Sequence, residues 1–129
     1  MKILHILARQ HLQLGSFDAA VSFYEDLLQQ KARLRLEPVE GTLKIAQVAS
    51  MLLIGAAEEI LDTVSQIKVA YLVEDIAAWA FELPKKGAAI VQPLTPIPTG
   101  IYMIVRHPDG LLVEYVEHAN KNPLDHIDN

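Results

Sequence analysis

Hydrophobic and polar residues alternate along the first part of the chain and then change to a helical spacing. The alternation from Ala8 to Leu14 predicts a strand over residues 3–14. Apolar residues then recur every three or four positions from Phe17 to Leu28, and Ser16 is the expected N-cap of this helix. The pattern next predicts three short strands, over residues 32–38, 42–48 and 51–54.

This order of elements is predicted a second time, after a linker over residues 56–66 that holds about one helical turn. The second copy consists of a strand, a helix capped by Asp75 and three further strands, over residues 67–73, 76–83, 88–91, 101–106 and 111–116. The proline-rich stretch 93–100 is expected to be a loop. Shifting the first half of the sequence by 59 positions aligns Arg9 with Lys68 and Ser16 with Asp75, so the two halves agree in register.

These elements place the chain in the α+β class, as one domain over residues 1–129 built from two tandem βαβββ modules. Module one covers about residues 3–55 and module two about residues 67–118. A polar tail follows over residues 119–129. The chain is long enough for one compact core, so no second domain is expected.

Composition narrows the classes of function. Hydrophobic residues make up 51% of the chain and the formal net charge is −5, with Lys and Arg scattered, so a nucleic acid partner is not expected. The absence of cysteine excludes a disulfide, a thiolate nucleophile and a Cys-type zinc site, and fits a cytoplasmic protein. His5 and Arg9 interrupt the apolar start, which argues against a signal peptide. No apolar run reaches the roughly eighteen residues that a membrane span requires.

One acid stands inside an apolar strand near the end of the chain. Pro108-Asp109-Gly110 has the composition of a tight turn between two strands, and Glu114 lies in the second of them. An ionised carboxylate in a half-buried strand costs free energy unless a partner neutralises it. Glu114 is therefore the first candidate for chemistry.

Two motifs within the doubled βαβββ pattern are characteristic of a known superfamily. Phe23-Tyr24-Glu25-Asp26-Leu27-Leu28 lies on the first helix, and His107-Pro108-Asp109-Gly110-Leu111-Leu112-Val113-Glu114 closes the second module. Together, over residues 3–118, they resemble the vicinal oxygen chelate superfamily, which includes glyoxalase I, extradiol dioxygenases and bleomycin-resistance proteins. The resemblance implies a curved mixed sheet, with the two modules forming cups around a central cavity, and a homodimer.

The resemblance also implies where a metal binds in the metal-dependent members, on the first and last strands of each module. The corresponding positions in this chain are Arg9, Leu53, Lys68 and Glu114. A divalent metal needs lone pairs from imidazole, carboxylate or amide groups. Arg9 and Leu53 offer none, and Lys68 offers one only after losing its proton. We therefore expect no metal and no other cofactor.

Several interpretations of these charged residues stay open. Three arrangements are possible for Arg9, Lys68 and Glu114. They form a structural ion pair in place of a metal site, they form an anion pocket for a carboxylate or phosphate, or their side chains do not meet. His11 follows Arg9 by two residues and so shares its strand face, which makes it a candidate acid or base beside Glu114. Tyr102 is a candidate for stacking on a planar ligand if its ring faces the cavity.

Three functions follow, in order of preference. The first is a metal-independent protein that binds a small drug or metabolite, anionic or aromatic, in the cavity between the modules, through Arg9, His11, Leu53, Lys68, Tyr102 and Glu114. The second is a lyase, isomerase or dioxygenase that uses a divalent metal or acid–base catalysis by Glu114 and His11. The third is a non-catalytic structural or regulatory dimer module.

Overall fold

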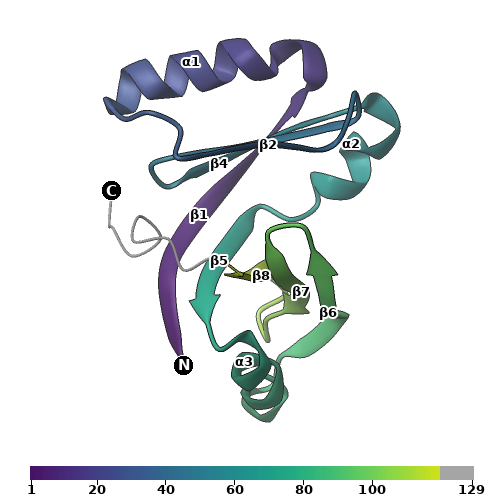
Figure 1. Ribbon diagram of the computed structural model, residues 1–129. Helices are drawn as coiled ribbons and strands as arrows, with labels where there is room; N and C mark the ends of the chain where they lie inside the picture. Colours follow the sequence, from purple (N-terminus) through teal and green to yellow (C-terminus); the bar gives the residue numbers. More distant parts are fainter. Residues whose placement is uncertain (120–129) are drawn as a thin grey trace. The chain divides into compact units, whose positions relative to one another are not determined.

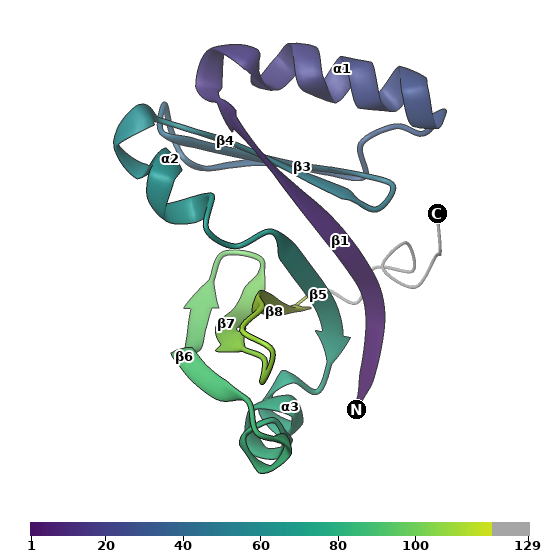
Figure 2. The same ribbon diagram turned by 180° about the vertical axis from the view of Figure 1, so that it is seen from behind.

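The computed structural model describes residues 1–119, which fold into two compact units. Of the described residues, the first unit is Ala8–Lys68, and the second unit consists of Met1–Leu7 together with residues 69–119. The long strand β1 (Lys2–Gln13) supplies residues to both units. Figures 1 and 2 show the elements of each unit from two opposite sides.

The first unit is a four-stranded sheet with a helix on one face. Its strands lie in the order β2-β3-β4-β1, where β4 is parallel to β1 and antiparallel to β3, and β3 is antiparallel to β2. The elements after β1 are the 3₁₀ turn η1 (Leu14–Ser16), α1 (Phe17–Leu28), β2 (Leu34–Val39), β3 (Leu43–Val48), β4 (Met51–Ala56) and α2 (Glu58–Val64).

Packing of α1 on this sheet forms the core of the first unit. Phe17 and Val21, one helical turn apart, are both buried and contact Leu53 in the same hydrophobic cluster. Gly55 permits this close approach, because a Cβ atom there would lie only 2.9 Å from Cδ1 of Phe17. In Figure 1, α1 runs across one side of β2 and β4. The side chains of β1 and β4 that do not face α1 therefore lie on the opposite face of the sheet.

The second unit is a sheet in the order β1-β5-β8-β7-β6. Strand β8 is parallel to β5 and antiparallel to β7, which in turn is antiparallel to β6. Its elements after β1 are β5 (Val69–Glu74), α3 (Ile76–Glu82), the 3₁₀ turn η2 (Pro84–Lys86), β6 (Ala89–Ile97), β7 (Gly100–Arg106) and β8 (Leu112–His118).

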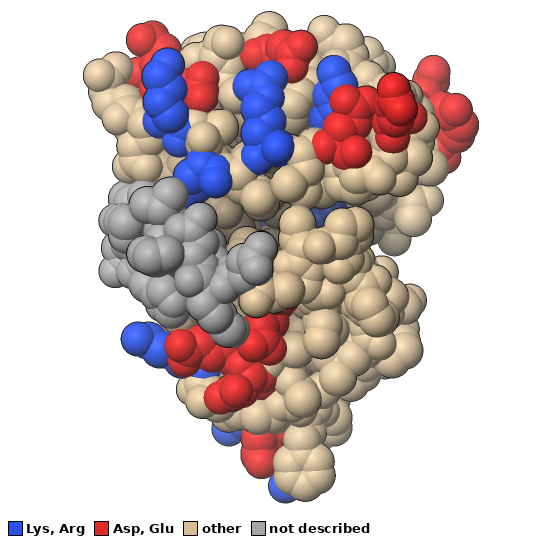
Figure 3. Space-filling view, in the orientation of Figure 1, with Lys and Arg blue, Asp and Glu red and all other residues tan. Residues whose placement is uncertain are grey.

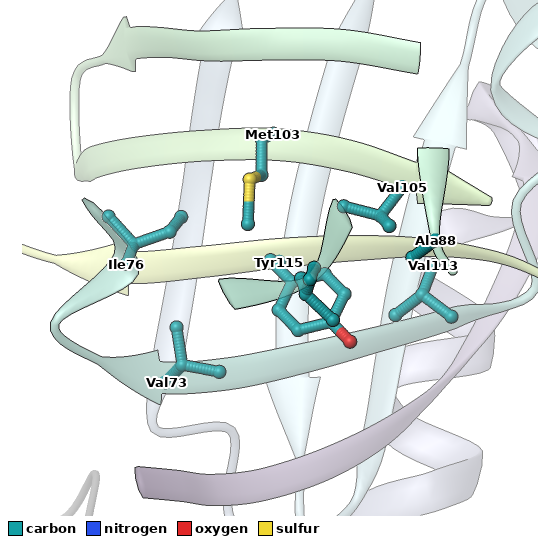
Figure 4. Packing of buried hydrophobic residues seen from close by; sticks show 8 residues of the cluster. Val73, Ile76, Ala88, Met103, Val105, Val113 and Tyr115 are labelled. Atoms are coloured by element: carbon teal, nitrogen blue, oxygen red, sulfur yellow. The ribbon is translucent and has the colours of Figure 1, made fainter. Parts of the chain in front are cut away.

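The second unit has its own core between the sheet and α3. Figure 4 shows Ile76, Met103 and Tyr115 directed toward one space above the strands, with Val73 and Val113 beside them. These side chains are almost completely buried. Burial of each such apolar side chain contributes about 1.5–3 kcal/mol to folding, so each unit holds a substantial core of its own.

The predicted α+β class with two βαβββ modules is confirmed. Helices α1 and α3 begin at Phe17 and Ile76, which are the positions related by the predicted shift of 59 residues. The turn between β7 and β8 is also confirmed, because the Gly110 amide donates to the His107 carbonyl at 2.9 Å and Gly110 has a φ of +96°.

Both predicted N-cap residues, Ser16 and Asp75, are confirmed in position, but the capping hydrogen bonds expected of their side chains are absent. Ser16 belongs to the 3₁₀ turn η1, and Asp75 has a φ of 54° and lies 3.4 Å from the N-terminal amine of Met1. The Ile76 amide at the start of α3 instead donates to Oε1 of Glu117, at 3.0 Å. A residue from a distant strand therefore caps this helix.

The loop predicted over residues 93–100 is wrong, because β6 continues to Ile97. This strand lies at the end of the strand order, where a proline need not donate to a neighbour. Its pairing with β7 shifts register twice, between Ile90 and Gln92 and between Gln92 and Thr95. The linker helix α2 is longer than the single turn expected. The predicted polar tail lies, except for Ala119, outside the described residues.

Candidate functional site

Strand pairing in the first unit decides which side chains lie on the face away from α1. Arg9 pairs with Leu52 and His11 pairs with Ile54, whereas Gln10 pairs with Leu53. Paired residues of neighbouring strands share a face and successive residues alternate. Because Leu53 packs against α1, both Arg9 and His11 lie on the opposite face. We call this the ligand face of the first unit.

Arg9 and Lys68 are neighbours within the first unit. The Arg9 amide donates a hydrogen bond to the Lys68 carbonyl at 2.9 Å, so the two backbones are adjacent. The Arg9 Nη2 atom also lies 3.4 Å from the carbonyl oxygen of Val64 at the end of α2. Lys68 is exposed and Arg9 is half-buried. Two basic residues are therefore adjacent where the backbone of β1 meets the segment just before β5.

His11 lies within the field of these two cations. Burial lowers the pKa of His11, and the positive charges of Arg9 and Lys68 lower it further, to about 4. The imidazole is therefore neutral at pH 7. Its Nε2 atom is buried and has no hydrogen-bond partner among residues 1–119. We call Arg9, His11 and Lys68 the cationic cluster, after the two charges that dominate it.

Leu53 does not belong to this site. Its side chain is fully buried in the core cluster with Phe17 and Val21. The residues of β4 on the ligand face are its two neighbours, Leu52 and Ile54. Successive residues of a strand face opposite sides of the sheet, so Leu53 faces the core while Leu52 and Ile54 face away from it.

Glu114 and Tyr102 lie in the second unit, on the sheet face away from α3. Val113 and Tyr115 pack into the core beneath α3, so Glu114 between them is directed to the other face. Glu114 pairs with Ala70 on β5, and Tyr102 pairs with Val116 on β8. Both side chains are half-buried. Tyr102 is thus the tyrosine that is available on this face, and Tyr115 belongs to the core.

The structure also shows an aromatic group that the sequence did not predict. The hydroxyl of Tyr115 is 2.8 Å from Nε2 of His107, and the Tyr71 and Tyr115 rings meet edge to face at 5.2 Å. Trp79 packs against the same core. Burial, with a smaller effect of Tyr71, raises the pKa of Tyr115 to about 12. This group fastens the turn after β7 to the core through the contact between His107 and Tyr115.

The donors present do not fit the divalent metal of the metal-dependent members. The guanidinium of Arg9 has no lone pair for a metal, and Leu53 lies in the core. Within residues 1–119, no three His, Cys, Asp or Glu side chains lie close enough together to hold a metal ion. A cation would also meet the positive charges of Arg9 and Lys68 beside His11.

Two surface hollows of the first unit lie away from the cationic cluster. One is lined by Ser22, Glu25, Asp26, Gln29, Gln30 and Lys31, and the other by Phe17, Asp18, Arg35, Leu36, Glu37 and Lys44. Both are shallow and neither contains His11, so we place no site there. In Figure 3, basic and acidic side chains intermix over the first unit rather than forming a uniformly basic surface.

No helix among residues 1–119 has the length and apolar character needed to cross a membrane.

Comparisons with known proteins agree with this architecture. A family model described as the Glyoxalase/Bleomycin resistance protein/Dioxygenase superfamily matches residues 2–115. An uncharacterized protein from Methanosarcina mazei is 35% identical, with a TM-score of 0.85, over 95% of this chain and 98% of that chain. No curated protein matches the sequence.

Two solved enzymes share the fold at lower identity. Methylmalonyl-CoA epimerase from Mycobacterium tuberculosis is 19% identical, with a TM-score of 0.70, over 92% of this chain and 91% of that chain. A mutant 4-hydroxymandelate synthase from Streptomyces coelicolor is 16% identical, with a TM-score of 0.63, over 94% of this chain and 50% of that chain. These likenesses concern the fold alone.

Proposed function

The chain belongs to the glyoxalase/bleomycin resistance protein/dioxygenase superfamily, the vicinal oxygen chelate superfamily, and from this premise we propose that it is a metal-independent protein that binds a small organic anion. The observation that carries the proposal is the cationic cluster, in which a neutral His11 with a buried, unpartnered Nε2 lies beside two cations. The ligand would contact the ligand face of the first unit.

The chemistry of the cluster suits an oxygen anion. A buried polar atom without a partner costs about 1–3 kcal/mol, and an oxygen that accepts from Nε2–H of His11 would recover that energy. Such a ligand selects the tautomer with the proton on Nε2. Arg9 and Lys68 would add charge-assisted hydrogen bonds to a carboxylate or phosphate.

Metal independence is proposed on the same grounds. The cluster presents positive charge where the metal-dependent members place ligands, so an anion takes the place that a cation has in those proteins. The proposal gives His11 a binding role and no role as a base, because a general base works best with a pKa near the working pH and that of His11 is about 4.

Titration calorimetry with sodium benzoate and inorganic phosphate, at pH 7.5 in the presence of EDTA, tests the proposal. We expect saturable binding of at least one anion by the chelator-treated protein. The Lys68→Gln variant should bind about three- to tenfold more weakly, because one exposed cation is lost. Lys31→Gln removes the same charge from an exposed position that lies outside the cluster and should leave affinity unchanged.

Binding that appears only when zinc, nickel, iron or manganese is added would contradict the proposal. Equal losses in Lys68→Gln and Lys31→Gln would also contradict it, because the effect would then come from net charge alone.

Two expectations from the resemblance and the composition stay predictions. The homodimer can be checked by analytical ultracentrifugation, and the cytoplasmic location by fractionation of the source cells.

A further inference from the structure

Apolar side chains continue from the cationic cluster across the ligand face of the first unit. Residues that pair across neighbouring strands form a row on this face, which runs from His11 through Ile54 and Ile45 to Leu36. The neighbouring row runs from Arg9 through Leu52 to the buried Gln47, whose amide donates to the Ala49 carbonyl. We call Leu36, Ile45, Leu52 and Ile54 the apolar shelf.

The shelf lies on the opposite face of the sheet from the core cluster beneath α1. Its residues alternate with Ala46 and Leu53, which face α1, so the shelf side chains point away from that helix. Ile54 is buried, whereas Leu36, Ile45 and Leu52 retain part of their exposure. Apolar surface that adjoins a few converging polar groups is the usual composition of a small-molecule site.

We propose that the ligand is an amphipathic carboxylate, with its anionic end on the cationic cluster and an apolar body on the apolar shelf. The assignment of the anionic end rests on the proposed function, and the shelf adds the apolar body. Because Arg9 and Leu52 are direct neighbours across β1 and β4 and both are partly exposed, one small molecule can contact both. A bare inorganic anion would leave the shelf unused.

A series of straight-chain carboxylates tests the assignment. Acetate, butyrate and hexanoate are titrated calorimetrically into the whole protein at pH 7.5, at constant ionic strength and with EDTA, beside inorganic phosphate. Affinity should rise about two- to fourfold for each added methylene, since one side of the chain lies on apolar surface. Hexanoate should therefore bind far more tightly than acetate or phosphate.

Two matched variants locate the effect. Leu52→Gln places an amide on the shelf and should reduce the gain in affinity for each added methylene. Leu27→Gln makes the same change on the exposed side of α1, where 59% of Leu27 is exposed, and should leave the whole series unchanged. If Leu52→Gln fails to fold, the dependence of wild-type affinity on chain length still tests whether the ligand has an apolar body.

The outcomes separate this inference from the proposed function. Binding of acetate, hexanoate and phosphate with equal affinity would overturn the apolar body and leave the anion site intact. A full chain-length effect in Leu52→Gln would also overturn the placement on the shelf. Failure of every anion to bind would overturn the proposed function itself.

Discussion

The two units share one order of elements but carry different chemistry at equivalent places. In the first unit, the pairing of β1 with β4 sets His11 beside Ile54. In the second unit, the pairing of β5 with β8 sets Ala70 beside Glu114. The first unit thus has an imidazole on its first strand, and the second has a carboxylate on its last strand. The repeated backbone plan fixes these positions, and the residues that occupy them determine what each unit can bind.

The units also differ in how their helices are held. Helix α1 spans Phe17–Leu28 and has no side-chain cap, whereas the shorter α3 spans Ile76–Glu82 and is capped by Glu117 from β8. The longer helix is held mainly by its buried face, and the shorter one also by a single long-range hydrogen bond. This difference predicts where each unit is most sensitive to substitution.

The largest effect is expected from truncation of the buried residue at the start of α1. Phe17→Ala should lower the free energy of unfolding by about 3–5 kcal/mol, because it removes a fully buried ring and leaves a cavity beside Gly55. Ile76→Ala, its counterpart in α3, should cost about 2–5 kcal/mol. Urea denaturation followed by circular dichroism measures both. A loss below about 1 kcal/mol for Phe17→Ala would contradict the packing described for the first unit.

An intermediate effect on stability is expected from the protonation of His11 as the pH is lowered. Between about pH 6.5 and about pH 4 the unfolded chain binds a proton on His11 that the folded protein does not, so stability falls as the pH falls through this window. The contribution should be about 1–2 kcal/mol after allowance for solvent screening. His11→Gln removes the group, so its denaturation midpoint should fall less between pH 7 and pH 4 than that of the wild type. Parallel pH profiles for the two proteins would contradict the environment assigned to His11.

The smallest effect is expected from the helix caps, and here the two units should respond to different extents. Glu117→Ala should cost about 1 kcal/mol, because the Ile76 amide loses its acceptor. Ser16→Ala should change stability by less than about 0.5 kcal/mol, because the Ser16 hydroxyl caps nothing. Thermal melts of the two variants provide the comparison, and a larger loss for Ser16→Ala would reverse it.

Most of the fold was predictable because its signals are local. Alternating and helical spacings identified the strands and helices, and the shift of 59 residues identified the repeat. The errors arose where distant contacts decide the outcome. Asp75 is a good N-cap by composition, but Glu117 takes that role from a strand far along the chain. Pro93 and Pro96 suggested a loop, but the edge position of β6 tolerates them.

The candidate site was predictable in part for the same reason. Arg9 and His11 share a face by simple alternation, so their juxtaposition could be inferred from one strand. Leu53 was selected from the resemblance, and alternation along β4 does not reveal that its side chain faces the helix. The face of Tyr102 was undecidable because both faces of β7 are apolar. The strand pairings in the structure show which face each of these two side chains occupies.

Nitrogen-15 NMR of histidine-labelled protein tests the central claim most directly. The claim is that neutral His11 binds an organic anion without a metal. Titration of hexanoate at pH 7.5 in EDTA should shift the Nε2 resonance of His11 saturably, and His107, which is held by Tyr115, should not respond. An Nε2 resonance of His11 that ignores hexanoate but shifts on addition of zinc after removal of the EDTA would contradict the claim.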